Sequence, residues 1–405
     1  MDPNAPQTPA DDAVPTGAEV EPRGADAPAE HAEPTGADVP LDDATPTVDE
    51  PTGTEPPGGE TSGGETSGVG TSAADAPPSQ AAAPPPEPGW RPDRLGEGYE
   101  FTDLPLDGGA HATLVAHRGQ RAEDGPAAGR TVLYVHGWSD YFFQRPLAEY
   151  WAQQGAAFYA VDLRGHGRSL DLDDPEARPG YIEDLADYDA EIEAALAIIA
   201  AEHPRTRPIL AGHSTGGLTL ALWVHRNPGR AAALVLNSPW LEFQFDAATR
   251  RLITPWLKWR SRRTESVPIR VRFPDHYARS VLLSRGNLPY ELDLKPPSSF
   301  PIYPAWISAV FAGHETVEKG LSITVPILVQ MSTTSVREKD YSSAMSAADI
   351  VLDVDVLARR APSLGTTVVI ERIPGAMHDV VLSDSPVRKS AFARITRFLN
   401  GYLQR

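Results

Sequence analysis

The sequence predicts an α/β fold with a mostly parallel sheet and helices on both faces. Short apolar segments alternate with helical segments from residue 131 onward, and some, such as 131–135, are almost continuously apolar. Such segments suit strands that helices cover on both faces. Before them, two strand-like segments flank an Asp-Gly-Gly turn at 107–109, which predicts a leading antiparallel hairpin.

The individual elements follow from local patterns. The hairpin strands are expected at 99–106 and 111–117. Apolar residues between 182 and 201 recur close to a 3.6-residue period, which predicts a helix. Further strands are expected at 131–135, 156–161, 208–211, 232–236, 325–331 and 366–371, and further helices at 147–154, 217–224 and 384–403.

Residues 244–320 interrupt this alternation and are rich in Pro, aromatic residues and Arg. They fall between two strands, so we expect a mostly helical cap inserted over the active edge of the sheet. Residues 250–279 contain nine Lys and Arg against two Asp and Glu, together with Trp256 and Trp259. This basic aromatic surface could make transient contact with a membrane surface, attract an anionic substrate, or form an ordinary lid with a solvated basic face.

The acidity of the chain is concentrated at its start. The formal charge is −19, and residues 1–88 hold 18 Asp and Glu against one Arg, so the remainder carries only −2. Residues 1–88 also contain no Phe, Trp or Tyr and 18 of the 40 prolines. Such a segment cannot bury enough apolar surface to offset its ordering entropy. We therefore expect a disordered acidic tail over 1–88, as a spacer or a docking segment, before one folded domain over 89–405.

Composition also excludes several classes of function. A nearly neutral folded region does not suit a nucleic-acid-binding protein. The absence of Cys removes disulfides, thiolate nucleophiles and Cys-based metal sites. The first residues have no signal-peptide pattern, and no apolar run approaches the roughly 18 residues of a membrane span. We expect a cytoplasmic protein. Neither metal-ligand spacing nor a G-x-G-x-x-G motif at a strand–helix junction is present, so we expect no metal and no cofactor.

A G-x-S-x-G sequence, Gly212-His213-Ser214-Thr215-Gly216, lies between the strand predicted at 208–211 and the helix predicted at 217–224. Strand, sharp turn and helix in this order form a nucleophile elbow, which exposes the serine hydroxyl. We therefore expect Ser214 to be a nucleophile, with a structural turn as the alternative. The backbone amide of Thr215 would point at an oxyanion formed there.

The partners of an activated serine should also follow strands. His378 lies on a loop after the last predicted strand and is the expected base. The acid should lie between residue 331 and His378, and Asp349 is preferred, with Asp353 and Asp340 as alternatives. Trp138, which follows His136-Gly137 at the end of the strand 131–135, is expected to supply the second oxyanion amide. The segment 162–169, with two glycines and several charged residues, is interpreted as a scaffold for that oxyanion loop.

These motifs together resemble the α/β-hydrolase superfamily. More narrowly, the chain resembles its monoacylglycerol lipase and lysophospholipase-like branch, grouped as serine aminopeptidase S33-type hydrolases. The resemblance covers about residues 95–405 and departs from the branch in Trp138 and in the lack of an Asp directly after the strand 325–331. The motifs are His136-Gly137, Asp162-Leu163-Arg164-Gly165-His166-Gly167-Arg168-Ser169, Gly212-His213-Ser214-Thr215-Gly216-Gly217 and Pro374-Gly375-Ala376-Met377-His378-Asp379.

The expected function is a cofactor-free serine hydrolase that cleaves carboxylic esters through an acyl-enzyme. Its substrate would be a small-molecule acyl ester, either an acyl lipid or another hydrophobic acyl ester. Two alternatives remain open. The same Ser-His-Asp triad could act on amide or peptide bonds as an aminopeptidase or amidase, or the fold could be a ligand-binding protein with a vestigial site.

Overall fold

The computed structural model describes residues 89–204, 206–243, 267–269, 274–283 and 288–403. All of these belong to one compact unit, Gln80–Arg405. The tail predicted over 1–88 lies outside the described residues. So does much of the cap predicted over 244–320, including its basic tryptophan segment.

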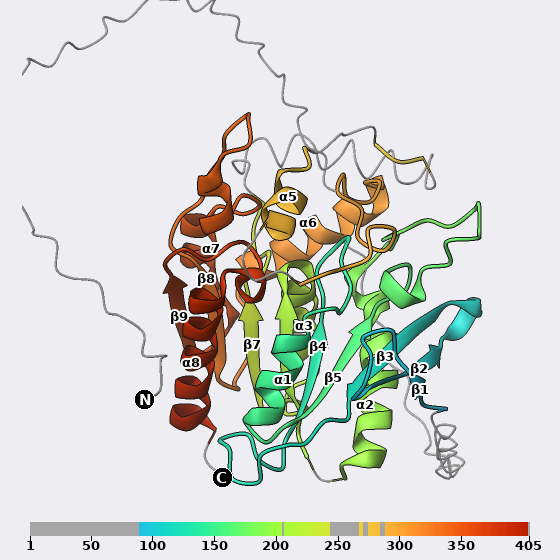
Figure 1. Cartoon of the computed structure of the whole chain (residues 1–405), viewed down its shortest axis with the longest axis vertical. Coiled ribbons are helices and arrows are strands. Elements are labelled where there is room, and N and C mark those ends of the chain that lie inside the picture. The colour runs from blue at the N-terminus through green and yellow to red at the C-terminus, as the bar shows by residue number, and fades with distance from the viewer. Residues whose placement is uncertain (1–88, 205, 244–266, 270–273, 284–287, 404–405) are drawn as a thin grey trace, which may run out of the picture. The chain divides into compact units, whose positions relative to one another are not determined.

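The strands form one sheet in the order β1-β2-β3-β5-β4-β6-β7-β8-β9 (Figure 1). The neighbouring pairs β1–β2, β2–β3 and β3–β5 are antiparallel, and every later pair in this order, from β5–β4 to β8–β9, is parallel. This confirms the predicted fold class. The strands are β1 (Arg91–Pro92), β2 (Tyr99–Pro105), β3 (His111–His117), β4 (Thr131–Val135), β5 (Ala157–Asp162), β6 (Ile209–His213), β7 (Ala233–Asn237), β8 (Ile327–Ser332) and β9 (Val368–Ile373).

Helices cover both faces of this sheet. The α-helices are α1 (Arg145–Gln153), α2 (Asp189–Glu202), α3 (Ser214–Arg226), α5 (His276–Leu283), α6 (Pro304–Glu318), α7 (Val354–Arg360) and α8 (Ser385–Tyr402). Short 3₁₀ turns are η1 (Asp107–Gly109), η2 (Gly167–Ser169), η3 (Leu185–Tyr188), η4 (Ser343–Ala347), η5 (Ala361–Leu364) and η6 (Val380–Leu382). Of the helices that the structure describes, none has both the length and the apolar character needed to cross a bilayer.

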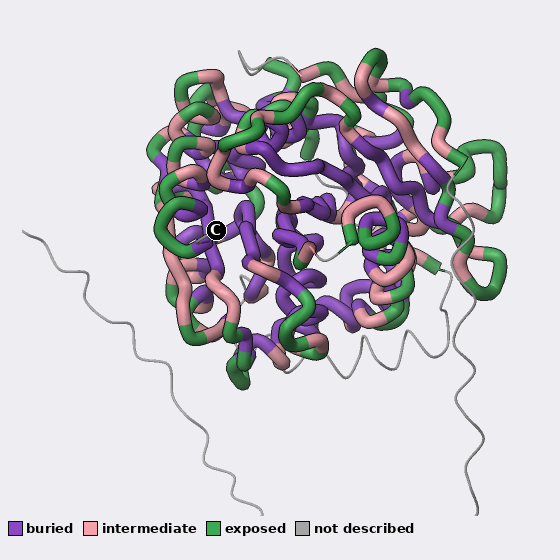
Figure 2. Tube along the Cα trace, turned by 90° about the horizontal axis from the view of Figure 1, so that it is seen from below, coloured by how far each residue is buried: buried purple, intermediate pink, exposed green. Residues whose placement is uncertain are grey.

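The core has two parts, one on each face of the sheet. All five residues of β4 are buried, and they alternate between the two faces. Leu133 and Val135 pack in a cluster with α2, α3 and α6, whereas Val132 and Tyr134 pack in a cluster with α1 and α8. Figure 2 shows these buried residues gathered in the interior, with exposed residues at the periphery. A strand buried on both faces explains why its sequence is almost continuously apolar.

Two helix boundaries differ from the sequence prediction. The helix expected over 182–201 is a 3₁₀ turn, η3, followed by α2. Asp184 and Asp187 form a reciprocal capping box there, so local polar bonds start the turn later than the apolar period suggests. The helix expected from residue 217 begins at Ser214, because the two glycines that follow are helical despite their low propensity.

The alternation of strands and helices stops after β7 and resumes at β8, and the described part of the intervening segment contains α5 and α6. Trp306, Val310 and Val317 of α6 belong to the same buried cluster as α3. Helix α6 therefore packs against α3. The cap over about 244–320 stays a proposal, because much of this segment lies outside the described residues.

Candidate active site

Ser214 occupies a strained turn between β6 and α3. Its φ angle is 50°, a left-handed value that is uncommon for a residue with a side chain and that is typical of strained functional turns. The glycines around it permit the close approach of strand and helix. A Cβ atom at Gly216 would lie 2.2 Å from the His136 carbonyl oxygen, and one at Gly212 would lie 2.9 Å from the Gly216 carbonyl oxygen. The turn therefore has the geometry of a nucleophile elbow.

The three predicted residues Ser214, His378 and Asp349 lie in one hydrogen-bonded chain. His378 Nε2 is 3.1 Å from Ser214 Oγ, and His378 Nδ1 is 2.9 Å from Asp349 Oδ2. All three residues are buried. A carboxylate that accepts a hydrogen bond from Nδ1–H keeps the proton on Nδ1 and leaves the Nε2 lone pair free to accept the serine proton. The geometry therefore allows His378 to act as a base toward Ser214.

The loop after β8 returns Asp349 to the end of its own strand. The Asp349 amide donates to Thr334 O at 2.9 Å, and the Val336 amide donates to Asp349 O at 3.0 Å. Asp349 Oδ1 accepts the Val351 and Leu352 amides at 2.8 and 2.7 Å, so only Oδ2 faces His378. These bonds explain how an acid 17 residues beyond β8 can still meet the histidine.

The two alternative acids lie elsewhere. The carboxylate of Asp353 is the N-cap of α7, where it accepts the Asp355 and Val356 amides at 3.0 and 3.1 Å. Asp340 is exposed on the loop after β8. Among the three candidates, the structure thus brings Asp349 to His378.

The loop that follows β4 runs directly beside the serine. A Cβ atom at Gly137 would lie 3.2 Å from Ser214 Cβ and 3.2 Å from His213 Cδ2, so only glycine fits there without displacement. Trp138 follows at once, and Thr215 is the second residue of α3. The roles of the Trp138 and Thr215 amides as an oxyanion hole stay a prediction, which this close approach supports.

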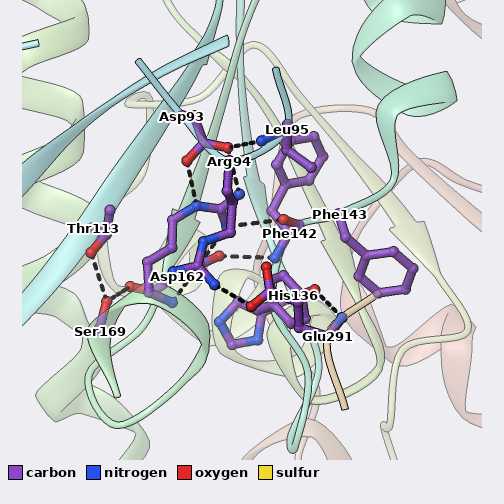
Figure 3. A network of polar contacts seen from close by, with 12 residues as sticks. Asp93, Arg94, Leu95, Thr113, His136, Phe142, Phe143, Asp162, Ser169 and Glu291 are labelled. Atoms are coloured by element: carbon purple, nitrogen blue, oxygen red, sulfur yellow. Dashed lines mark hydrogen bonds and ion pairs between the residues drawn. The ribbon is translucent and has the colours of Figure 1, made fainter. Parts of the chain in front are cut away.

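The segment 162–169 supports that loop through a buried ion network (Figure 3). Arg168 lies 2.7 Å from Asp162 and 2.6 Å from Asp93, and its side chain is 4% exposed. Asp162 Oδ1 accepts the Phe142 amide at 2.8 Å, and Arg168 donates to Phe142 O at 3.0 Å. A buried ion cluster whose hydrogen bonds are satisfied holds a single geometry. The segment 162–169 is thus bonded to the loop after β4, as a scaffold for that loop would be.

His136 adds a second support. Its Nδ1 lies 2.6 Å from Gly137 O, and its Nε2 accepts the Leu163 amide at 3.0 Å. The ring therefore carries its proton on Nδ1 and joins the loop to the residue after β5. It is therefore a structural histidine.

A further buried cluster beside His378 was not foreseen from the sequence. The His213 ring centroid is 4.8 Å from that of His378, and His213 Nδ1 is 3.1 Å from Asn237 O. Asp379 accepts Asn237 Nδ2 at 2.7 Å and Gln144 Nε2 at 3.1 Å. These bonds fix the loop of His378 to the end of β7 and to the residue that precedes α1. They join residues 142 and 235 positions apart, and no local pattern signals such pairs.

Burial lowers the pKa of His213, with the charge of Asp379 opposing this effect and that of His378 reinforcing it. For Asp379, burial raises the pKa, but His213, Asn237, the Val381 amide and Gln144 together outweigh it. The pKa of Asp379 is therefore lowered overall. His213 thus stays neutral beside His378, and Asp379 stays ionised within its bonds.

Asp140, His213 and Asp379 also bring three ligand atoms within 4.8 Å of one another. This group does not fit a metal ion. Lys295 Nζ lies 2.6 Å from Asp140 Oδ1 and already supplies the cation. Asp379 is engaged by two side-chain amides, so the oxygens that a metal would need are taken.

Comparisons with known proteins identify a family for the chain. The model of the family described as "Serine aminopeptidase, S33" matches residues 126–384. A monoacylglycerol lipase of Mycolicibacterium smegmatis is 30% identical over 109 residues, which are 27% of this chain and 37% of that protein. A non-heme haloperoxidase of Rhodococcus erythropolis is 36% identical over 114 residues, 27% of this chain and 36% of that protein. The chain thus matches little more than a third of the length of these relatives.

Solved structures show the same fold. A soluble variant of monoglyceride lipase from Saccharomyces cerevisiae has a TM-score of 0.51 at 15% identity, covering 74% of this chain and 94% of that one. A thermostable carboxyl esterase from Bacillus coagulans has a TM-score of 0.52 at 16% identity, covering 75% and 99%. Because the family model covers more than half of the sequence, the chain belongs to the serine aminopeptidase S33 family.

Proposed function

We propose that the protein cleaves carboxylic esters as a serine hydrolase through an acyl-enzyme. The observation that carries this proposal is the buried hydrogen-bonded chain from Ser214 Oγ through His378 to Asp349. Esterases and lipases among the relatives support the reaction class.

In the proposed mechanism, Ser214 Oγ attacks the ester carbonyl carbon while its proton passes to His378 Nε2. Asp349 holds the ring and stabilises the imidazolium that forms. The Trp138 and Thr215 amides would donate to the oxyanion of the tetrahedral intermediate. His378 then gives its proton to the leaving alkoxide. A water molecule repeats the sequence on the acyl-enzyme and releases the acid.

Aromatic side chains beside the serine support a hydrophobic acyl ester as the small-molecule substrate. The Trp240 amide donates to Ser214 O at 3.0 Å, so this residue lies directly next to the nucleophile. Its ring lies 6.0 Å from Trp306 and 5.7 Å from Phe243, and Trp306 stacks on Trp138 at 4.5 Å. Apolar aromatic surface of this kind favours an apolar acyl chain over a charged one. Contact with a membrane surface stays a prediction, because the basic tryptophan segment lies outside the described residues.

The test is hydrolysis of p-nitrophenyl acyl esters by the full chain and its Ser214→Ala variant. Loss of the serine hydroxyl removes the nucleophile, so kcat should fall at least about 10³-fold. Ser390→Ala, which removes a hydroxyl on α8, should keep the wild-type rate and serves as the control. A Ser214→Ala variant that turns over at the wild-type rate would falsify the proposal.

One alternative is favoured by the family description, which names an aminopeptidase. The same three residues could act on an amide, and aminoacyl anilides compared with acyl esters of equal size separate the two reactions. The other alternative is a ligand-binding protein with a vestigial site. Fluorophosphonate labelling addresses it, because rapid labelling that Ser214→Ala abolishes requires an activated serine.

A further inference from the structure

Three consecutive residues of the loop after β4 form hydrogen bonds with one short segment between β7 and α6. We call residues 136–143 the oxyanion loop and residues 291–300 the clamp segment. The two segments run in opposite directions, so Ser139 pairs with Phe300 and Tyr141 pairs with Glu291. The contacts are Phe300 N donating to Ser139 Oγ at 3.0 Å, Lys295 Nζ to Asp140 Oδ1 at 2.6 Å, and Glu291 N to Tyr141 Oη at 2.9 Å.

The central contact is a buried ion pair. The side chains of Lys295 and Asp140 are 9% and 3% exposed. Asp140 lies in the group whose ligand atoms approach within 4.8 Å, beside His213 and the ionised Asp379. Two carboxylates this close in the interior repel each other unless a cation offsets their charge. Lys295, bonded to Asp140, supplies that positive charge.

The loop also has a conformation that needs external support. Ser139 has a φ angle of 54°, in the left-handed region, so its backbone is strained. Strain of this kind persists where the surroundings fix the residue. The bond from the Phe300 amide does so here, and Ser139 lies two residues beyond Gly137, where an added Cβ atom would lie 3.2 Å from Ser214 Cβ.

We propose that the clamp segment positions the oxyanion loop, and that Lys295 is a positioning residue that acts through Asp140. This inference rests on the proposed function. Backbone donors stabilise a developing oxyanion only when they are held in place before the reaction. Lys295 is buried and bonded to Asp140, so it acts on the loop and does not bind substrate. Its loss should therefore lower kcat and leave KM nearly unchanged.

The kinetic test compares Lys295→Met with Arg118→Met. Met keeps the length of the side chain and removes its charge. Arg118 directly follows β3, which two strands separate from β6, and it forms an ion pair with Glu202 at 2.7 Å, so it serves as a control. We expect Lys295→Met to lower kcat on p-nitrophenyl butyrate about 10- to 100-fold with KM within about twofold, as for loss of a transition-state donor. The inhibition constant of butylboronic acid, a mimic of the tetrahedral intermediate, should rise in parallel with the loss in kcat.

Asp140→Asn and the double variant Asp140→Asn/Lys295→Met complete a mutant cycle. If the ion pair carries the effect, the double variant should be less impaired than the product of the two single losses predicts. Arg118→Met should keep kcat and the boronic acid constant within about twofold. Thermal unfolding identifies variants that fail to fold.

Hydrogen exchange provides a readout that does not need ester cleavage. In Lys295→Met, the amides of residues 137–143 should exchange at least about tenfold faster than in wild type or in Arg118→Met, as expected when a local restraint is lost. If Lys295→Met does not fold, Tyr141→Phe is measured instead, because it removes only the acceptor for Glu291 N. Exchange of the amides of residues 137–143 should again be faster than in wild type.

The outcomes separate the two proposals. Unchanged exchange in the oxyanion loop, or a folded Lys295→Met variant with wild-type kcat, overturns the clamp. A rise in KM alone also overturns it, because it assigns Lys295 to substrate binding. If the wild type cleaves no ester while exchange in the loop rises in Lys295→Met, the clamp stands and the proposed function fails.

Discussion

Asp349 and Asp353 are separated by four positions, and their carboxylates have different partners. Asp349 Oδ2 faces His378 Nδ1 at 2.9 Å, whereas Asp353 accepts two amides at the start of α7. Chemically identical substitutions at the two positions therefore distinguish the acid of the triad from its neighbour.

We expect Asp349→Asn to lower kcat by about 10⁴-fold, because its amide would donate to His378 and impose the wrong tautomer. Asp353→Asn should keep kcat and stability, since Asn caps a helix about as well as Asp. Kinetics with p-nitrophenyl esters measure kcat, and urea unfolding measures the stability of both variants. If Asp353→Asn were the inactive variant, the assignment of the acid would be wrong.

Residues of the candidate site could be predicted from the sequence where each follows a strand directly. Ser214 and His378 have that signal, and the structure places them within 3.1 Å. Asp349 was harder to place, because its loop returns to the end of β8 through backbone bonds that leave no local pattern. Lys295 could not be foreseen, since its partner Asp140 is 155 residues away.

At the level of elements, the start of α2 shows how a local polar bond overrides apolar periodicity. The Asp184 carboxylate accepts the Ala186 amide at 2.9 Å, and the Asp184 amide donates to Asp187 Oδ2 at 3.2 Å. The turn η3 and the helix after it therefore begin at a defined residue, and the apolar pattern alone placed that start too early.

Asp184→Ala removes the cap acceptor and should lower the free energy of unfolding by about 1 kcal/mol. Asp184→Asn keeps an acceptor oxygen and should lower it much less. Urea unfolding followed by circular dichroism measures both, and kcat should not change in either. Equal stability of Asp184→Ala and wild type would show that the capping box contributes nothing.

The strands were predictable because burial on both faces leaves a nearly continuous apolar sequence, as in β4. Their order was not predictable to the same degree. β5 lies between β3 and β4, and nothing in an apolar strand identifies the neighbour with which it pairs. Packing of whole layers decides this order, so it appears only in three dimensions.

At the level of the whole molecule, buried neutral histidines make stability depend on pH. Burial lowers the pKa of His166 to about 3, and the nearby His136 adds to this effect. Burial lowers the pKa of His213 as well. Above pH 6.5, His166 is neutral in both the folded and the unfolded chain. Below it, only the unfolded chain gains the proton, so the free energy of unfolding falls until about pH 3.

His166→Asn should therefore reduce the fall in the free energy of unfolding between pH 7 and pH 4.5 by about 2.5 kcal/mol, from about 1.4 kcal/mol per unit of pH below pH 6.5. Urea unfolding at both pH values gives the fall in the free energy of unfolding for wild type and for the variant. Subtracting one fall from the other cancels the contributions of the carboxylates, which both proteins share. The same fall in variant and wild type would contradict the burial of a neutral ring at this position.

The bonds of Asp379 and His378 also have a consequence for synthesis of the chain. His378 lies 164 residues after Ser214, and Asp379 lies 235 residues after its partner Gln144. At about 5–20 residues per second, Ser214 leaves the ribosome on the order of ten to thirty seconds before its proposed base. Throughout that interval the nascent chain carries an unactivated serine. Sequence separation alone would thus delay the proposed acyl transfer until nearly the whole sheet has been made.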